Sequence, residues 1–291
     1  MLELNRTDLA VEAIELHAGS GVSVGEVEIG GVKITHLSVD TDEAAERIGK
    51  PRGKYVTISA PQLLYDTEVY SEACSQIAKA VSEMADTNAK ILVAGLGNRD
   101  ITPDALGPEV VSRVFVTNHI KEQLQYDFVE KLGRVSAIAP GVLGTTGMES
   151  SQIIRGVVNE QKPDLVIAVD AYAAKSLSRI STTIQISDSG IIPGGGVGNR
   201  RAALNKETLG VPVIAIGVPT VVDAVTVAAD ITGADDEDTL REKLGSDAPR
   251  LVVTPKDIDL VIDRCAKTVA NGINLAAHPQ LSIEEIESYI G

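Results

Sequence analysis

Two stretches decide the fold class of this 291-residue chain: Ile91-Leu92-Val93-Ala94-Gly95-Leu96-Gly97-Asn98 and Leu165-Val166-Ile167-Ala168-Val169-Asp170-Ala171. Each opens with an apolar run that is typical of a buried parallel strand. An acid follows each run: Asp170 ends the second, and Asp104 lies just past the first in Thr102-Pro103-Asp104-Ala105-Leu106-Gly107-Pro108. In open α/β sheets, ligands bind at this carboxyl edge. Two carboxylates that meet there could split a peptide bond, hold a metal or bind a cationic ligand.

Further apolar runs alternate with amphipathic segments around these two stretches. The pattern predicts more strands, at Tyr55–Ser59, Val135–Ala139, Thr182–Ile186 and Val213–Gly217. It predicts helices at Ser71–Ala85, Asp104–His119, Glu149–Glu160, Thr220–Asp230, Pro255–Ala277 and Leu281–Gly291. The alternation indicates an α/β fold with a mostly parallel central sheet and helices on both faces. Two strands around Gly30-Gly31, Val24–Ile29 and Val32–Ser38, predict a hairpin and thus a small N-terminal β-rich extension.

The composition limits the classes of partner. A net charge of −15 argues against direct binding of nucleic acid, because phosphate contacts need basic patches. No run of 18 or more apolar residues is present, so we expect no membrane span. The two cysteines, Cys74 and Cys265, have no pairing motif, which fits a reducing compartment.

Each acid also has a purely structural interpretation. Asp104 would suit the N-cap of a helix, since aspartate is a preferred cap. Asp170 would cap the segment Ala171–Leu177, although a carboxylate that ends an apolar strand is costly unless it is hydrogen-bonded, paired or functional. Gly95-Leu96-Gly97-Asn98 is neither a dinucleotide fingerprint nor a phosphate-binding P-loop, because the third glycine and the Gly-Lys-Ser/Thr are missing.

Long uninterrupted runs carry a resemblance to a known family. The runs span most of the chain: Arg6–Ala13, Gly95–Asn98, Thr102–Pro108, Val135–Val142, Asp170-Ala171, Thr183–Ile191, Gly196–Asn199 and Pro212–Val225. On these residues the chain resembles the germination proteases of spore-forming bacteria, which degrade small acid-soluble spore proteins.

The resemblance implies an endopeptidase whose proposed catalytic acids fall on Asp104 and Asp170. It also implies a zymogen that removes its own leader. The family cuts after an acidic residue that precedes an apolar one and Ala, and Asp8-Leu9-Ala10 fits that pattern. We therefore expect residues 1–8 to be a propeptide, cut between Asp8 and Leu9. As a chain terminus, this leader is expected to be extended and poorly packed.

The same resemblance gives the remaining expectations. Residues 9–291 should form a single peptidase domain, with the β-rich extension in 9–60 and the catalytic core in 88–280. The substrates would be small acid-soluble spore proteins, the assembly a homo-oligomer (a tetramer), and the location the cytoplasm of the forespore or spore core. No cofactor and no metal are expected.

Two rival functions stay open. The hydrogenase maturation endopeptidases look similar in fold and in the Gly-x-Gly-Asn turn, and they hold a metal with two acids and a histidine. None of the four histidines here (17, 36, 119 and 278) follows a core strand, which favours a metal-free site. The second rival is a non-catalytic module whose acids bind a basic ligand. A serine nucleophile is not indicated, because no Gly-x-Ser-x-Gly is present, and free cysteines are usually just buried.

Overall fold

A computed structural model describes residues 7–17, 19–123, 127–194, 202–232 and 251–290. Its centre is one sheet of nine strands in the order β1-β2-β3-β7-β8-β6-β4-β5, with the short β9 paired to β8. The strands are β1 (Val22–Ile29), β2 (Val32–Val39), β3 (Gly53–Ser59), β4 (Lys90–Gly95), β5 (Arg134–Ile138), β6 (Leu165–Ala174), β7 (Thr183–Ser187), β8 (Val213–Asp223) and β9 (Val252–Val253).

The central strands confirm the predicted fold class. β5, β4, β6 and β8 run parallel to their neighbours in this group, while β7 and β9 join β8 antiparallel. The hairpin strands β1 and β2 form as predicted, and β3 connects them antiparallel to β7. The N-terminal extension therefore continues the main sheet, because β7 offers a free edge beside β8 for β3 to pair with.

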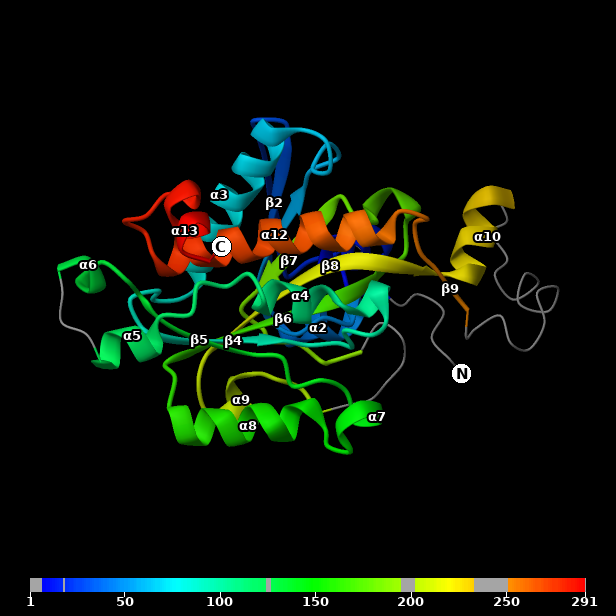
Figure 1. The fold of residues 1–291 in the computed structure, drawn as a ribbon. Coiled ribbons are helices and arrows are strands. Elements are labelled where there is room, and N and C mark those ends of the chain that lie inside the picture. The colour runs from blue at the N-terminus through cyan, green and yellow to red at the C-terminus, as the bar shows by residue number, and fades with distance from the viewer. Residues whose placement is uncertain (1–6, 18, 124–126, 195–201, 233–250, 291) are drawn as a thin grey trace.

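Helices cover both faces of the sheet, as Figure 1 shows. The longer ones are α3 (Thr67–Met84), α8 (Ser150–Gln161), α10 (Ala224–Thr232), α12 (Ile258–Ala277) and α13 (Ile283–Ile290). The shorter ones are α1 (Ala10–Leu16), α2 (Asp42–Ile48), α4 (Leu106–Val111), α5 (Asn118–Gln123), α6 (Asp127–Glu130), α7 (Leu143–Thr146) and α9 (Lys206–Leu209), with the 3₁₀ turns η1 (Thr102–Asp104) and η2 (Leu177–Arg179).

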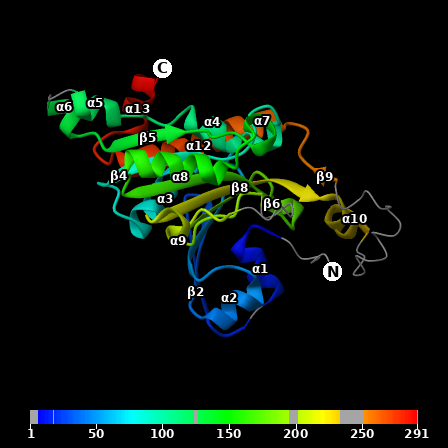
Figure 2. The ribbon, with the colours of Figure 1, turned by 90° about the horizontal axis from the view of Figure 1, so that it is seen from below.

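Each face of the sheet has its own apolar core. On one face, α3, α4 and α12 bury alternate residues of the strands, Ile91, Val93, Ile167 and Val169 among them. On the other face, α8 packs on the residues between, such as Leu92, Ala94 and Ala168. Because side chains alternate across a strand, apolar runs of this kind are buried on both sides. Figure 2 shows that α1, α2 and β2 project away from this double-faced core.

Two predicted helices have different limits in the structure. The helix expected over Asp104–His119 is interrupted, since α4 ends at Val111 and α5 begins at Asn118. The chain between them bonds to other segments instead: the N–H of Phe115 donates to Oδ1 of Asn274 (2.9 Å) and the N–H of Thr117 to the carbonyl of Val135 (3.0 Å). The helix expected over Thr220–Asp230 begins only at Ala224, since the β-branched run before it continues β8.

The strand that carries Asp170 is longer than predicted. β6 continues to Ala174, paired with β8 and with one register shift after Tyr172. Asp170 consequently lies within a strand and caps no helix. Among the described residues, no helix is long and apolar enough to cross a membrane.

The leader is not loosely packed where the structure describes it. Leu9 and Ala10 are fully buried and Thr7 is nearly so. The leader was expected to be an extended, poorly packed arm over residues 1–8, and this was wrong for its described residues, Thr7 and Asp8, because Thr7 is buried and Asp8 is hydrogen-bonded to Ala173. Two further segments of the sequence, an acidic stretch at 234–238 and most of a glycine-rich stretch at 194–201, lie outside the described residues.

Candidate active site

The tight approach of two glycines fixes the turn that carries Asp104. A Cβ on Gly95, the last residue of β4, would lie 2.1 Å from the carbonyl oxygen of Gly107 in α4. A Cβ on Gly97, which has a φ of +106°, would lie 2.0 Å from the carbonyl oxygen of Asp104. Only glycine permits this contact and this φ at low cost. The glycines therefore bring η1 directly against the end of β4.

Hydrogen bonds hold Asp104 in this turn. The N–H of Asn98 donates to the Asp104 carboxylate (Oδ2, 2.8 Å) and to its carbonyl oxygen (3.1 Å). The Thr220 hydroxyl of β8 donates to the carbonyl of Pro103 (2.8 Å). Asp104 is not the N-cap of α4, whose cap position is Ala105 and makes no side-chain bond. The capping interpretation of Asp104 was wrong.

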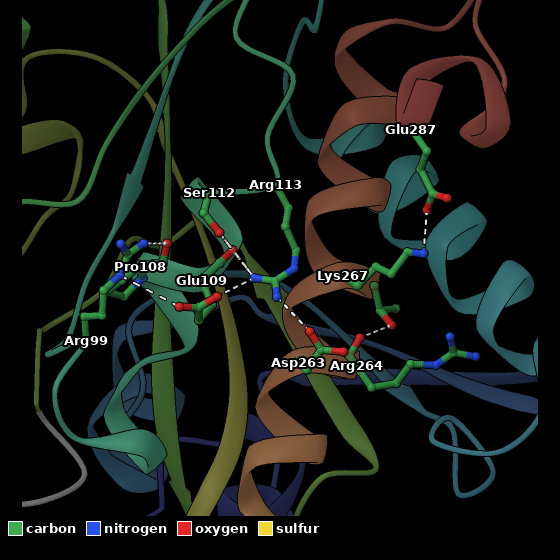
Figure 3. Close-up of polar contacts among 10 residues, drawn as sticks. Arg99, Pro108, Glu109, Ser112, Arg113, Asp263, Arg264, Lys267 and Glu287 are labelled. Carbon is green, nitrogen blue, oxygen red and sulfur yellow. Dashed lines mark hydrogen bonds and ion pairs between the residues drawn. The ribbon is translucent and has the colours of Figure 1, made fainter. Parts of the chain in front are cut away.

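Behind this turn, ionic contacts join α4 to α12 (Figure 3). Arg113, just past the end of α4, contacts Glu109 of α4 at 2.6 Å and Asp263 of α12 at 2.7 Å. Arg99, in the turn itself, donates to the carbonyl of Pro108 at 3.2 Å. Such partly exposed pairs contribute little stability singly, but together they tie the Asp104 turn to the two helices.

Asp170 lies at the centre of the sheet. β6 runs between β4 and β8, and Asp170 pairs in register with Gly217 of β8. Its side chain is buried, with 5% exposed. Its Oδ1 accepts a hydrogen bond from the N–H of Ala171 (3.0 Å).

Burial, together with the nearby carboxylates of Asp104 and Asp8, raises the pKa of Asp170 to about 8. The N–H groups of Ala171 and Gly194 act in the opposite direction. Desolvation and like charges both disfavour the ionised form. The structure thus places Asp104 and Asp8 within electrostatic reach of Asp170, and Asp170 keeps its proton at neutral pH.

This raised pKa predicts a pH-dependent gain in stability for Asp170→Asn. Below about pH 4 the carboxyl is neutral in the folded and unfolded chain. Between pH 4 and 8 the unfolded carboxyl ionises while the folded one stays neutral, so the stability of the unaltered chain falls as pH rises. The Asn variant has no carboxyl at this position, so its stability does not fall with pH in this way. One pKa unit corresponds to about 1.4 kcal/mol, or roughly 2–4 °C in Tm for a chain of this size.

Thermal unfolding of both chains at pH 4, 6 and 8 measures this effect. The variant should melt at a higher temperature at pH 8, and the gap should close toward pH 4. A gap that is constant with pH would contradict the raised pKa.

The residues around the predicted cut lie against β6, just past Asp170. The N–H of Asp8 donates to the carbonyl of Ala173 (3.0 Å), and the N–H of Ala173 donates to Oδ2 of Asp8 (2.8 Å). The Leu9 side chain enters the apolar core on the α8 face of the sheet. The chain on both sides of the Asp8–Leu9 bond is therefore fixed beside the candidate acids.

Three side chains that the sequence analysis missed hold this segment. Gln185 of β7 accepts from the N–H of Ala10 (2.5 Å) and donates to the carbonyl of Asp8 (3.0 Å). Lys50 donates to the carbonyl of Thr7 (2.6 Å). The buried Glu12 accepts from the backbone N–H groups of Lys175 and Ser176, at 2.8 and 2.9 Å, and from the Thr7 hydroxyl.

One sequence signal for these residues existed. Gln185 stands between two isoleucines in a short strand, where a buried polar side chain needs a partner. Lys50 and Glu12 gave no such signal, because each lies in a stretch where charged residues are common.

Other candidate groups lie elsewhere or outside the described chain. Among the described residues, no three His, Cys, Asp or Glu side chains gather as a metal would need. Cys74 and Cys265 are buried in α3 and α12, and burial raises each thiol pKa to about 12, so neither is a ready nucleophile. The glycine-rich stretch 195–198, whose backbone N–H groups could face a developing oxyanion, lies outside the described residues.

Comparison with known proteins gives a consistent result over nearly the whole chain. Residues 3–234 match the family model described as germination protease. The germination protease of Caldanaerobacter subterraneus subsp. tengcongensis is 44% identical over 98% of both chains. That of Clostridium acetobutylicum is 41% identical, again over 98% of both. That of Bacillus subtilis is 40% identical over 98% of this chain and 96% of its own.

One solved structure is also similar. It is a [NiFe] hydrogenase maturation protease, HycI, from Thermococcus kodakarensis, with 20% identity and a TM-score of 0.36. The match covers 66% of this chain and 98% of that one.

Proposed function

The chain belongs to the germination protease family, and we propose that it is an aspartate-dependent endopeptidase that begins the degradation of small acid-soluble spore proteins during germination. Asp104 and Asp170 are its catalytic pair. It is made as a zymogen and cuts its own chain between Asp8 and Leu9. No cofactor or metal takes part in the reaction.

One observation carries the proposal: Asp170 is buried in mid-sheet beside a second carboxylate, Asp104, and its pKa is raised to about 8. A structural carboxylate would be paired with a cation or exposed, because a buried charge without such a partner is costly. Strongly perturbed pKa values of this kind are concentrated at functional sites.

The pair supplies both an acid and a base. One carboxyl keeps its proton and the other is ionised, since two close carboxylates do not both ionise readily. The ionised one takes a proton from water as the water oxygen attacks the scissile carbonyl carbon. The protonated one gives its proton to the carbonyl oxygen. When the intermediate collapses, the C–N bond breaks and a proton returns to the leaving amine. The two roles belong to the pair, which titrates as a unit.

The docked N-terminal segment supports the zymogen part of the proposal. Asp8 and Leu9 are fixed on β6 next to Asp170 by the hydrogen bonds described above. A substrate segment attached to its own enzyme has a high effective concentration. The segment therefore needs no separate recognition to be cut first.

The remaining features rest on the family. We expect protein substrates of the small acid-soluble class, a homo-oligomer (a tetramer), and action in the cytoplasm of the forespore and spore core. The acidic chain, with a net charge of −15, would not bind nucleic acid directly.

Intact mass measurement of the full chain tests the zymogen proposal. The unaltered chain, held at mildly acidic pH, should lose the mass of residues 1–8, while Asp104→Asn should keep it. The Asn variant retains size and a hydrogen-bonding oxygen, so the turn is preserved, but it cannot ionise. If the variant is trimmed as fast as the unaltered chain, the cut belongs to another protease and self-processing is refuted.

A further inference from the structure

One row of backbone positions links Asp170 to a polar side chain two strands away. Asp170 of β6 pairs in register with Gly217 of β8, and Gly217 pairs with Gln185 of β7. Paired positions in a sheet point to the same face, and neighbouring strands lie about 4.8 Å apart. Asp170 and Gln185 therefore stand on one face, about 10 Å apart at the backbone, with Gly217 between them in the sheet.

This face is the one that receives the N-terminal segment. Ala168 and Tyr172 lie two positions before and after Asp170 in β6, so they point to the same face as Asp170. Both pack in the same apolar cluster as Leu9. The space over Gly217 is filled from above, because a Cβ there would lie 2.1 Å from the Tyr172 ring. The Tyr172 ring therefore stands between the side chains of Asp170 and Gln185 on this face, and residues 8–10 are held at the Gln185 end of the row.

Gln185 holds the backbone on both sides of the predicted cut. Its Nε2 donates to the carbonyl oxygen of Asp8 (3.0 Å), and its Oε1 accepts from the N–H of Ala10 (2.5 Å). The Asp8 carbonyl is the group that water attacks if the chain is cut before Leu9. Gln185 is buried, with 3% exposed, so these bonds lie out of bulk water.

We propose that Gln185 is a further catalytic residue, which donates a hydrogen bond to the carbonyl oxygen of the bond being cut. This proposal rests on the proposed function, since it needs the Asp104–Asp170 pair to be the hydrolytic centre and the cut to follow Asp8. Negative charge grows on that oxygen as water adds. A donor already aimed at it in a water-poor site stabilises the charge without reorganising.

The same amide would bind a separate protein substrate. Within the segment it bonds only to backbone atoms, the carbonyl before the scissile bond and the N–H of the second residue after it, and it also hydrogen-bonds the side chain of Tyr172. It therefore fits an extended segment of any sequence at those two positions. It sets the position of the scissile bond relative to Asp170 and leaves side-chain selection to other groups.

A purely structural role makes a different prediction. If Gln185 only anchors the chain's own N-terminal segment, its loss would affect folding or trimming and leave the cutting of a separate peptide unchanged. Steady-state cleavage of a peptide added in trans separates the two roles. A suitable peptide has the sequence of residues 2–16, and mass spectrometry follows its cleavage.

Two variants and one matched control make the test. Gln185→Leu removes the donor and the acceptor, and kcat should fall about 10²- to 10³-fold, as for loss of one oxyanion donor. Gln185→Glu keeps the shape but has a donor only when protonated, so its kcat relative to the Leu variant should rise as pH falls. Thr183→Val is the control: Thr183 is on the same face of β7 and equally buried, and its hydroxyl has no hydrogen-bond partner among the residues that the structure describes.

The outcomes are distinct. A Leu variant that folds, judged by its Tm, and keeps kcat within about threefold of the control overturns the proposal, as does a Glu variant whose kcat relative to the Leu variant does not rise as pH falls. If the control is active and Asp170→Asn is not, the proposed function stands whatever Gln185 does. If the unaltered chain does not cut the peptide, or Asp170→Asn still does, the proposed function itself fails.

Discussion

Asp170→Asn should reduce cleavage of a small acid-soluble spore protein by at least about 10³-fold, because asparagine can neither hold nor transfer the proton that the proposed pair would share. A single acid–base role contributes about 10²- to 10⁴-fold, and the two carboxyls act together, so Asp104→Asn should cost as much. Both variants keep the shape of the side chain, which is buried at Asp170 and half-buried at Asp104. Substrate binding should change little, and the loss should fall on kcat.

Quantitative mass spectrometry of substrate fragments measures this loss. Asp164→Asn is the matched control, since Asp164 immediately precedes the same strand, β6, at the opposite edge of the sheet, where its carboxylate accepts from the N–H of Lys90 (2.9 Å). It should retain full activity. The unaltered chain should also stay active after exhaustive chelation. Activity that disappears with a chelator and returns with a divalent metal would support metal-dependent chemistry instead.

Gly97→Ala is expected to damage the same site without touching a catalytic group. An added Cβ would lie 2.0 Å from the carbonyl oxygen of Asp104, and the φ of +106° is strained for any L side chain. The turn must shift, and Asp104 moves with it. We expect about 10²-fold lower activity, since a displacement of roughly 1 Å in an active site has that effect. The free energy of unfolding should fall by about 1–3 kcal/mol.

A second glycine gives the control for this variant. Gly156 lies in α8, and a Cβ there would meet no atom within 4 Å. Gly156→Ala should keep full activity and gain about 0.5–1 kcal/mol of stability, because alanine favours a helix over glycine. Peptide cleavage and denaturant unfolding measure both variants. A Gly97→Ala chain with normal kcat would show that the contact between β4 and η1 does not position Asp104.

Several features of the fold were predictable from local pattern. The apolar runs of β4 and β6, the alternation of strands with helices, and the hairpin at Gly30-Gly31 all formed as expected. These predictions succeeded because a strand buried on both faces must be apolar throughout, and because positive φ at a tight turn favours glycine. Element ends were less predictable: β8 continued through Thr220 and α4 stopped at Val111. Both limits depend on hydrogen bonds to distant segments.

The candidate acids were likewise partly predictable from local pattern and partly dependent on tertiary contacts. The sequence by itself indicated Asp104 and Asp170, since each follows an apolar run, and parallel sheets bind ligands at the edge where such runs are expected to end. Only the tertiary structure decided that both Asp104 and Asp8 lie within electrostatic reach of Asp170, and that its carboxyl keeps a proton. Burial and charge separation are properties of the packed chain, so no local pattern encodes the pKa of a side chain.

The docking of the N-terminal segment is the feature that depends most clearly on the tertiary structure. A terminal segment with a short helix after it predicts a loose arm, yet Leu9 is fully buried and residues 8–10 are bound to β6 and Gln185. The partner amide is 175 positions away in the chain from Ala10. The sequence determined which residues can be buried, strand-forming or acidic. Which of them meet was decided by the order of strands in the sheet, because that order sets β7 and β6 on either side of Gly217.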